Sequence, residues 1–368
     1  MCGIAGVVST SAATRPLARE VGDAMAGRLQ HRGPDGRTGY ESPSGRCVLG
    51  HTRLAVIDLD TGDQPMPNED GTVQVVFNGE IYNFRRLRDE LEDRGHRFRS
   101  RSDTEVLAHG WEEWGERLVG RLEGMFAFAV WDERSGTLFI ARDRAGQKPV
   151  FLYRDRGRLA FASEIKSLLA LPDADDALDP TAFPLYLAYG YVPQPDTFYE
   201  RIQALPPATW LRIDTGSRRE VVEGYWRLDF GERLGKGVGG GIDDAAKRLR
   251  DLMRGAVERR LIADVPLGAF LSGGIDSSVV VGLMSEIMDR PVRTFSIGFE
   301  DAPLFDETSH AETVAKHFGT EHTAFRVGAQ SVDLVERLVR MYDQPFGDSS
   351  AIPTYIVSGL AREHVTVA

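Results

Sequence analysis

Cysteine occupies position 2, directly after the first methionine, in Met1-Cys2-Gly3. Methionine is readily trimmed before so small a residue, so we expect Cys2 to carry a thiol and a free α-amine on one carbon. An α-amine titrates near neutrality and can act as the general base for its own thiol. Cys2 is therefore a candidate nucleophile, although most cysteines near a terminus are small apolar residues that begin a strand.

A second set of residues suited to chemistry follows an apolar run at 266–271. It reads Ser272-Gly273-Gly274-Ile275-Asp276-Ser277-Ser278. Two glycines let backbone amides approach an anion, and a helix that starts here points its positive end at the same place. The serine hydroxyls suit phosphate oxygens, and Asp276 suits Mg²⁺. A capped strand-to-helix turn explains one or two of these residues but not the set, so the segment predicts a phosphate-binding loop.

Both sets need secondary structure to position them. To about residue 210 the pattern predicts mainly strands, including 126–131, 137–142 and 159–163, with helices at 16–29, 83–94 and 103–117. A glycine-rich stretch at 232–242 is interpreted as a linker. Strands and helices then alternate, in the order helix 243–260, strand 266–271, helix 276–288, strand 292–299, helix 306–318, strand 322–327, helix 331–342 and strand 364–368. This alternation predicts a parallel sheet.

The composition excludes several classes of protein. With 368 residues, 42% hydrophobic and 27% charged, the chain is typical of a globular protein of two or three domains. No apolar run approaches membrane-spanning length, and the N-terminus does not resemble a secretory signal. The net charge of −11 disfavours a nucleic-acid-binding surface. Only Cys2 and Cys47 are present, which excludes a disulfide scaffold and fits a reducing cytoplasm.

With both sets of residues in view, the chain resembles glutamine-hydrolysing asparagine synthetase over essentially its whole length. The matching blocks in its first part, which resemble a class II glutamine amidotransferase, are 2–6, 31–36, 50–58, 77–83 and 102–105. The matching blocks in its second part are 271–278, 295–299 and 343–348. The resemblance implies an α+β N-terminal-nucleophile hydrolase domain at 2–210, with stacked antiparallel sheets between helices. A connecting segment at 211–242 and an incomplete α/β parallel-sheet domain of the ATP-pyrophosphatase type at 243–368 would follow.

In the first domain the resemblance implies glutamine hydrolysis. Cys2 would attack the carboxamide to form a γ-glutamyl thioester, with Asn78 and the Gly79 N–H as the oxyanion hole. The glutamine-binding residues would be Arg53 on the α-carboxylate, Glu80 and Asp103 on the ammonium, and Leu54, Ala55, Val56, Ile57, Asn78 and Gly79. Each of these residues also has a simpler interpretation, which is a turn for Asn78-Gly79 and a helix cap for Asp103. Taken singly, these interpretations are favoured over a role in glutamine binding. Their occurrence together with Cys2 favours the catalytic one.

In the second domain the resemblance implies ATP and Mg²⁺ as cofactors. The ATP-binding residues would be Leu271, Ser272, Gly273, Gly274, Asp276, Ser277, Ser278 and Ile297, with Asp276 on the metal. Asp306-Glu307 and Asp348 are candidate contacts to metal or amino acid, or equally ordinary carboxylates of loops and helix starts. The implied reaction activates aspartate as β-aspartyl-AMP, from which channelled ammonia displaces AMP to give asparagine. The partners are then small molecules, namely glutamine, aspartate and ATP, without nucleic acid or membrane, and a homodimer is compatible.

Three other functions stay open. A related ATP-dependent amidotransferase would act on a sugar or natural-product carboxylate. Another class II amidotransferase, such as glucosamine-phosphate synthase, would lack the loop at 272–278, and a non-catalytic scaffold would not need Cys2. Family members continue beyond the segment matching Val365–Ala368 into an acidic loop that completes the ATP site, so we expect a truncated synthetase domain. An unpaired strand at 364–368 supports this, because it would expose a sheet edge; a naturally short chain would retain glutaminase activity alone.

Overall fold

The computed structural model describes two compact units of the chain. One comprises Met1–Leu228 with Asp343–Gly347, and the other comprises Asp229–Tyr342 with Asp348–Ala368. The described residues are 1–10, 17–155, 157–229, 241–299, 306–328 and 332–368. The predicted linker at 232–242 therefore lies almost entirely outside the described residues. Among the helices that are described, none has the length and apolar character needed to cross a membrane.

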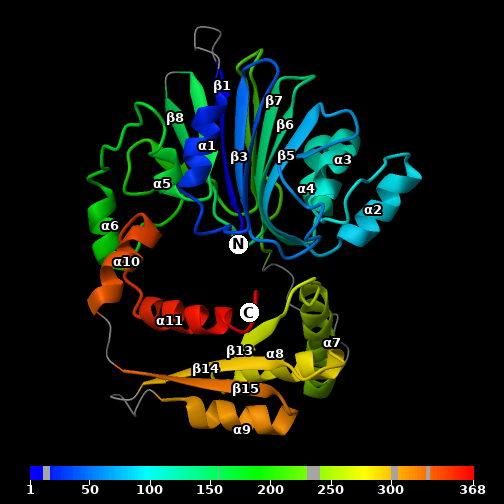
Figure 1. Ribbon diagram of the computed structural model, residues 1–368, viewed down its shortest axis with the longest axis vertical. Helices are drawn as coiled ribbons and strands as arrows, with labels where there is room; N and C mark the ends of the chain where they lie inside the picture. Colours follow the sequence, from blue (N-terminus) through cyan, green and yellow to red (C-terminus); the bar gives the residue numbers. More distant parts are fainter. Residues whose placement is uncertain (11–16, 156, 230–240, 300–305, 329–331) are drawn as a thin grey trace. The chain divides into compact units, whose positions relative to one another are not determined.

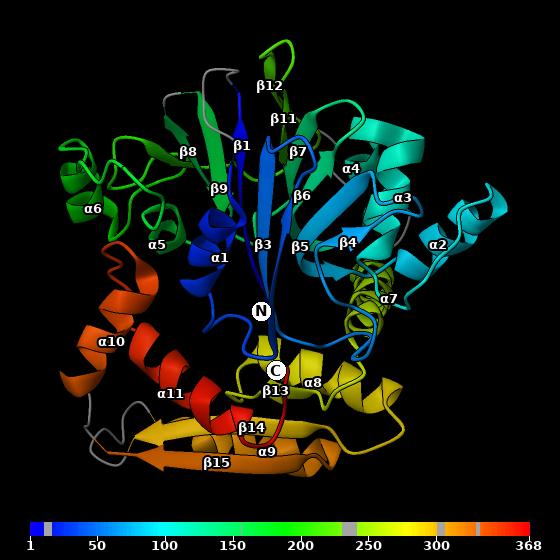
Figure 2. The same cartoon turned by 45° about the horizontal axis from the view of Figure 1, so that its top comes forward.

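Two six-stranded antiparallel sheets form the first unit (Figure 1). The first sheet has the order β10-β8-β9-β1-β3-β2, with β1 (Gly3–Ser9), β2 (Gly36–Glu41), β3 (Cys47–Arg53), β8 (Phe151–Asp155), β9 (Arg158–Ala162) and β10 (Ile202–Ala204). The second has the order β12-β11-β7-β6-β5-β4, with β4 (Met66–Pro67), β5 (Val73–Ile81), β6 (Gly124–Asp132), β7 (Thr137–Arg142), β11 (Thr209–Asp214) and β12 (Glu220–Gly224). Figure 2 shows β11 and β12 extending the second sheet beyond β7.

The two sheets pack face to face through a shared apolar core. Ile4 and Leu49 of the first sheet belong to one buried cluster with Val76, Trp131 and Ile140 of the second. The inner strands have long, nearly continuous apolar runs because each sheet is covered on both faces. The turn between β6 and β7 ends at a glycine of positive φ, as the sequence predicts for this hairpin.

Helices cover the outer faces of this sandwich. Helices α1 (Arg19–Gly27) and α5 (Ile165–Leu168) pack on the first sheet through a cluster that includes Met25 and Leu168. Helix α3 (Glu105–Trp114) contacts β4, β5 and β6 of the second sheet. The remaining helices of the unit are α2 (Phe84–Asp93), the 3₁₀ turn η1 (Gly115–Arg117), α4 (Leu118–Arg121) and α6 (Ala182–Tyr189). The predicted arrangement of stacked antiparallel sheets between helices is confirmed.

The second unit contains a parallel sheet of order β13-β14-β15. Its elements are α7 (Ile242–Arg260), β13 (Gly268–Phe270), α8 (Ile275–Ile287), β14 (Arg293–Phe299), α9 (Thr308–Phe318), β15 (Glu321–Val327), α10 (Val332–Tyr342) and α11 (Ala351–Arg362). Val281 of α8 and Ala315 of α9 share one buried cluster with Leu271, whereas Ala361 of α11 packs in another with Phe295. The predicted alternation and parallel sheet are confirmed, and α11 is a helix that the sequence analysis did not predict.

The expectation of an unpaired strand at 364–368 is wrong. Leu267 and Val367 form a parallel bridge, in which the Gly268 N–H donates to the Val367 carbonyl at 2.8 Å. The Thr366 N–H also donates to Pro266 O at 3.1 Å. The apolar side chain of Val365 is buried with Phe295 because this segment lies beside β13. The segment therefore adds a short partner to the sheet instead of an exposed edge.

Candidate functional site

The register of the first sheet brings Cys2 beside the residues that follow β3. Because Gly3 pairs with Thr52, the preceding Cys2 lies next to Leu54, whose N–H donates to Cys2 Sγ at 3.4 Å. Burial raises the pKa of the Cys2 thiol, although this N–H and the positive charge of the terminal amine lower it. A thiol in this setting is neutral in the free protein and needs a base beside it before it can attack.

Asn78 and Gly79 lie near the end of β5, in the sheet that packs against β1. Asn78 is 1% exposed, and its amide nitrogen has no hydrogen-bond acceptor among the described residues. A Cβ at Gly79 would lie 2.0 Å from the Met125 carbonyl oxygen, so only glycine fits there. Buried donors without a partner are costly and rare, so the Asn78 amide nitrogen is free to donate a hydrogen bond to a group brought into the site.

Two carboxylates, the partly buried Glu80 and the buried Asp103, share the surroundings of Cys2. Asp103 lies just before α3, and its Oδ2 accepts the Ile81 N–H at 2.8 Å. Burial raises the pKa of Asp103 to about 6. Burial, together with the charge of Asp103, raises the pKa of Glu80 well above its usual range. Both charges also raise the pKa of the Cys2 thiol, so the pair suits a cation brought by a substrate.

Arg53 ends β3, and the loop that follows wraps around its guanidinium. The loop contains Leu54, Ala55, Val56 and Ile57. Arg53 Nη1 donates to Asp63 Oδ1 at 2.9 Å and to Leu59 O at 3.2 Å, and Nη2 donates to the Asp58 carbonyl. The Asp63 side chain is 73% exposed, so a substrate carboxylate can replace it without uncovering a buried charge. Arg53 thus has two bonds that shape the loop and one that is exchangeable.

The structure adds residues near Cys2 for which the sequence analysis predicted no role. Arg32 Nε donates to the Cys2 carbonyl at 2.9 Å, and its Nη1 lies 2.8 Å from Glu164 Oε1. The Asp35 carboxylate accepts the Ala55 N–H at 2.9 Å. Arg32 and Asp35 belong to the block 31–36, so the matching block was the available signal. Lys148 is buried in the same electrostatic environment as Cys2 and Glu80, and no sequence motif pointed to it.

The segment Ser272–Ser278 spans the end of the β13–α8 connection and the first turn of α8, so a helix starts within it, as predicted. Gly273 has a φ of 81°, and a Cβ there would lie 2.6 Å from the Ala311 backbone nitrogen, so this position requires glycine. Ser272 Oγ lies 3.0 Å from Ser277 Oγ and accepts the Gly274 N–H at 3.2 Å. Asp276 is exposed in the first turn of α8. The predicted hydroxyls, glycines and carboxylate are therefore gathered at one helix start.

The other predicted residues of the second unit lie along the parallel strands or at helix starts. The Leu271 N–H donates to Phe295 O at 2.8 Å, and Ile297 follows on β14. Asp306 Oδ1 accepts the Thr308 N–H at 3.0 Å at the start of α9. Asp348 Oδ1 accepts the Ser350 N–H at 2.8 Å before α11. The structure thus shows helix-start bonds for both aspartates, and metal or substrate contacts for them stay a prediction.

Comparison with known proteins places the chain in a family. Residues 1–226 match the glutamine amidotransferase domain model, and residues 248–368 match the asparagine synthase model. A putative glutamine-hydrolysing asparagine synthetase 2 of Methanocaldococcus jannaschii is 36% identical over 389 residues, covering 100% of this chain and 73% of the relative. The chain belongs to the glutamine-hydrolysing asparagine synthetase family. The predicted resemblance is confirmed.

Other relatives in this family are considerably longer than the chain. Asparagine synthetase 1 of Bacillus subtilis is 35% identical over 374 residues, which are 100% of this chain and 57% of that protein. Asparagine synthetase 2 of Arabidopsis thaliana is 34% identical over 355 residues, which are 92% of this chain and 53% of that protein. The chain thus spans little more than half the length of these two relatives.

Proposed function

We propose that the first unit hydrolyses glutamine at Cys2, and that the ammonia serves an ATP-dependent amidation of aspartate in the protein that contains both units. The observation that carries the first half is the buried Asn78 amide nitrogen, which has no acceptor in the described part of the chain and lies next to the tightly packed Gly79. Membership of the asparagine synthetase family supports the second half. A reducing cytoplasm is the proposed setting, because the Cys2 thiol must stay reduced.

The proposed hydrolysis uses the residues around Cys2 in a fixed order. After removal of Met1, the Cys2 α-amine takes the thiol proton and the thiolate attacks the carboxamide carbon. The Asn78 amide and the Gly79 N–H stabilise the oxyanion, and the ammonium form of the α-amine returns the proton to the departing ammonia. Water then adds to the thioester in the same way and releases glutamate. Arg53 would hold the substrate carboxylate, and Asp103 and Glu80 would hold its ammonium.

The loop Ser272–Ser278 fits the phosphates of ATP. A helix N-terminus, two glycines and three serine hydroxyls form an anion site by general physical chemistry, and the exposed carboxylate of Asp276 suits Mg²⁺. When bound, Mg·ATP supplies the activated phosphate that makes the aspartate carboxyl a good acceptor. In this proposal Leu271 and Ile297 present backbone groups to the nucleotide from adjacent strand ends.

The test of this function follows nitrogen from glutamine to product. The protein that carries this chain is incubated with ATP, Mg²⁺, aspartate and glutamine labelled with ¹⁵N in its amide, and products are identified by mass spectrometry. Labelled asparagine supports the proposal. If a protein as long as the relatives releases labelled ammonia but forms no labelled asparagine, aspartate is rejected as the acceptor. Absence of glutamate formation would reject the hydrolysis as well.

Glutamine binding is expected to weaken as the pH falls through about 6. The ammonium of the substrate needs ionised carboxylates, and the raised pKa of Asp103 makes this group lose its charge already in that range. The folded-state pKa lies above the unfolded value, so protonation also stabilises the free protein. Calorimetry on a Cys2→Ala variant should show the affinity for glutamine falling as the pH is lowered from 8 to 5. The free energy of unfolding of the same variant should not fall over this range. A pH-independent affinity would remove the carboxylates from the ammonium site.

Asp276→Asn is expected to suppress pyrophosphate release while leaving glutamine hydrolysis unchanged. The variant keeps the shape of the side chain and removes the charge proposed for Mg²⁺. Pyrophosphate release and glutamate formation are measured on the same preparation of the protein that carries this chain. Asp289→Asn, which changes a carboxylate after α8, is the matched control and should alter neither rate. Unchanged pyrophosphate release in Asp276→Asn would remove Asp276 from the metal site.

A further inference from the structure

Four side chains suited to metal binding converge beside the second sheet of the first unit. Glu69 follows β4, His96 lies between α2 and α3, and His109 and Glu112 lie one turn apart on α3. One ligand atom from each can be chosen so that all four lie within 4.8 Å of one another. These residues come from three separate segments, and the mechanism proposed above uses none of them.

The distances between these atoms approach those around a tetrahedral ion. Glu69 Oε1 lies 3.0 Å from His96 Nδ1, and Glu69 Oε2 lies 3.2 Å from His109 Nδ1. His109 Nδ1 lies 3.8 Å from Glu112 Oε2. Ligands at 2.0 to 2.2 Å from a tetrahedral Zn²⁺ are about 3.4 Å apart. Small rotations of these side chains therefore suffice to close them around an ion.

The second nitrogen of each imidazole faces another carboxylate. His96 Nε2 lies 3.3 Å from Glu113 Oε1, and His109 Nε2 lies 3.5 Å from Glu105 Oε1. The Nδ1 atoms of His96 and His109 thus both face Glu69. Their Nε2 atoms face carboxylates that are not among the four proposed ligands. Metal-binding histidines almost always donate their other N–H to such an acceptor, which fixes the ring and raises its basicity.

Buried polar atoms of two residues in the cluster make no aligned hydrogen bond to any residue that the structure describes. The His109 side chain is 0% exposed, and neither of its ring nitrogens makes an aligned hydrogen bond to a described residue. Glu112 Oε2, which faces His109, is equally without one. The other oxygen of Glu112 accepts from Asn68 Nδ2 at 2.9 Å and from Arg134 Nη2 at 2.8 Å. The carboxylate is thus held so that one oxygen is left for a ligand.

The charge of the cluster calls for a cation. Glu69, Glu105 and Glu112 surround the single buried imidazole of His109. A proton on His109 is one way to supply positive charge, and a divalent ion that replaces it supplies more. Metal binding to imidazole releases that proton.

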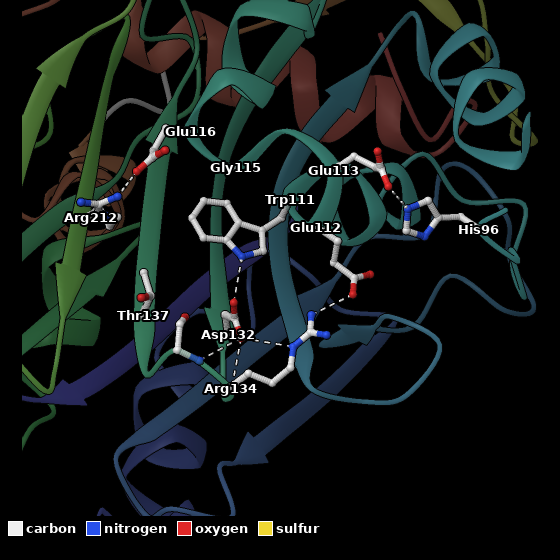
Figure 3. Close-up of a pocket in the computed structure, with 11 residues that line it drawn as sticks. His96, Trp111, Glu112, Glu113, Gly115, Glu116, Asp132, Arg134, Thr137 and Arg212 are labelled. Carbon is white, nitrogen blue, oxygen red and sulfur yellow. Dashed lines mark hydrogen bonds and ion pairs between the residues drawn. The ribbon is translucent and has the colours of Figure 1, made fainter. Parts of the chain in front are cut away.

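An adjoining pocket gives this cluster a route to solvent. A cavity of about 650 Å³ is lined by His96, Glu112 and Glu113, and by Arg134 and Trp111. Figure 3 shows His96 in contact with Glu113 and the Glu112 carboxylate in contact with Arg134 at the wall of this pocket. An ion can therefore enter from this side, whereas His109 closes the cluster on the buried side.

We propose that Glu69, His96, His109 and Glu112 bind one divalent transition-metal ion, with Zn²⁺ as the best match. Two imidazoles and two carboxylates suit Zn²⁺ better than Mg²⁺ or Ca²⁺, which take oxygen ligands. The ion would join the segment after β4 and the α2–α3 connection to α3. It is a structural site, independent of the chemistry at Cys2.

Zinc titration of the chelator-treated chain tests this site. A Cys2→Ala background removes the one thiol that is partly exposed, because thiolates bind zinc. Calorimetry should show one equivalent of Zn²⁺, and Co²⁺ in its place should give the strong visible absorption of tetrahedral coordination. His96→Gln and Glu69→Gln, whose side chains are partly exposed, should each weaken binding by more than about tenfold, and Glu113→Gln by about tenfold.

Matched controls separate this site from surface binding. His317→Gln changes an exposed histidine on α9 and should leave zinc affinity unchanged. Zinc should also raise the melting temperature of the parent chain but not that of His96→Gln. If His109 carries only a proton, the chelator-treated chain will bind no stoichiometric zinc, and the proposal fails. Equal affinity in the parent, His96→Gln and Glu69→Gln would place the ion elsewhere and overturn it too.

Discussion

Replacing Cys2 with alanine is expected to abolish glutamine hydrolysis while ammonia-dependent amidation survives. The variant removes the only atom proposed to form the thioester, and the segment 272–278 proposed to bind ATP contains different residues. Loss of a nucleophile that acts together with its base removes nearly all the rate enhancement, so we expect a fall of at least about 10⁴-fold in glutaminase kcat. Glutamate formation and amide formation from added ammonium chloride are measured on one preparation of the protein that carries this chain.

Cys47→Ala is the matched control for this prediction. Cys47 is fully buried in the core between the sheets, and burial raises the pKa of its thiol well above the usual range. Its loss should lower the free energy of unfolding by about 1 kcal/mol and leave kcat unchanged. Cys2→Ser also tests the role of Cys2 as nucleophile. It places a hydroxyl, which is a weaker nucleophile, at the position of the thiol. Retained hydrolysis in Cys2→Ala would end the assignment of Cys2 as nucleophile.

Much of the fold follows from local patterns in the sequence. The pattern at 137–142 predicts a strand, and β7 has the same bounds, because apolar residues and a turn glycine are local signals. The connection from β13 to α8 is predicted for the same reason, since glycines and serines directly follow an apolar strand. The local pattern does not predict helix α11, because Pro353 lies in its first turn. Proline is tolerated in a first turn, although elsewhere it usually interrupts a helix. The pairing of Val367 with Leu267 joins residues far apart in sequence, which a local pattern does not contain.

The candidate site shows where local reasoning ends. Matching blocks predict Cys2, Asn78 and Asp103 as site residues, but these residues come from the start of β1, from β5 and from the segment before α3. Lys148 has no motif around it, and only the folded chain brings its charge near Cys2 and Glu80. The proposed metal site of Glu69, His96, His109 and Glu112 likewise forms only in the folded chain. Two of its four residues, His109 and Glu112, lie one turn apart on α3, but Glu69 and His96 come from other segments. Long-range packing determines which residues come together in such a site. The spacing in the sequence predicts only the neighbours that lie on the same helix.

Two buried asparagines in the first unit should respond to alanine in opposite ways. Asn78→Ala is expected to lower glutaminase kcat by about 10²- to 10³-fold, or about 2.7–4 kcal/mol of transition-state stabilisation, with little change in KM. The Asn78 amide nitrogen has no acceptor among the described residues, so loss of this nitrogen leaves no described acceptor unpaired. The free energy of unfolding should therefore change little, and the rate loss should appear in fully folded protein.

Asn83→Ala supplies the matched contrast. Asn83 Nδ2 donates to Arg121 O at 2.9 Å, and its Oδ1 accepts the Glu123 N–H at 2.9 Å. Removing this amide leaves both backbone groups unpaired, at a cost of about 1–3 kcal/mol each, but does not touch the oxyanion site. Denaturant unfolding and glutamate formation on both variants should therefore separate stability from catalysis. An Asn78→Ala variant that loses stability as Asn83→Ala does, and keeps its kcat, would show that the Asn78 amide is structural and that the oxyanion hole lies elsewhere.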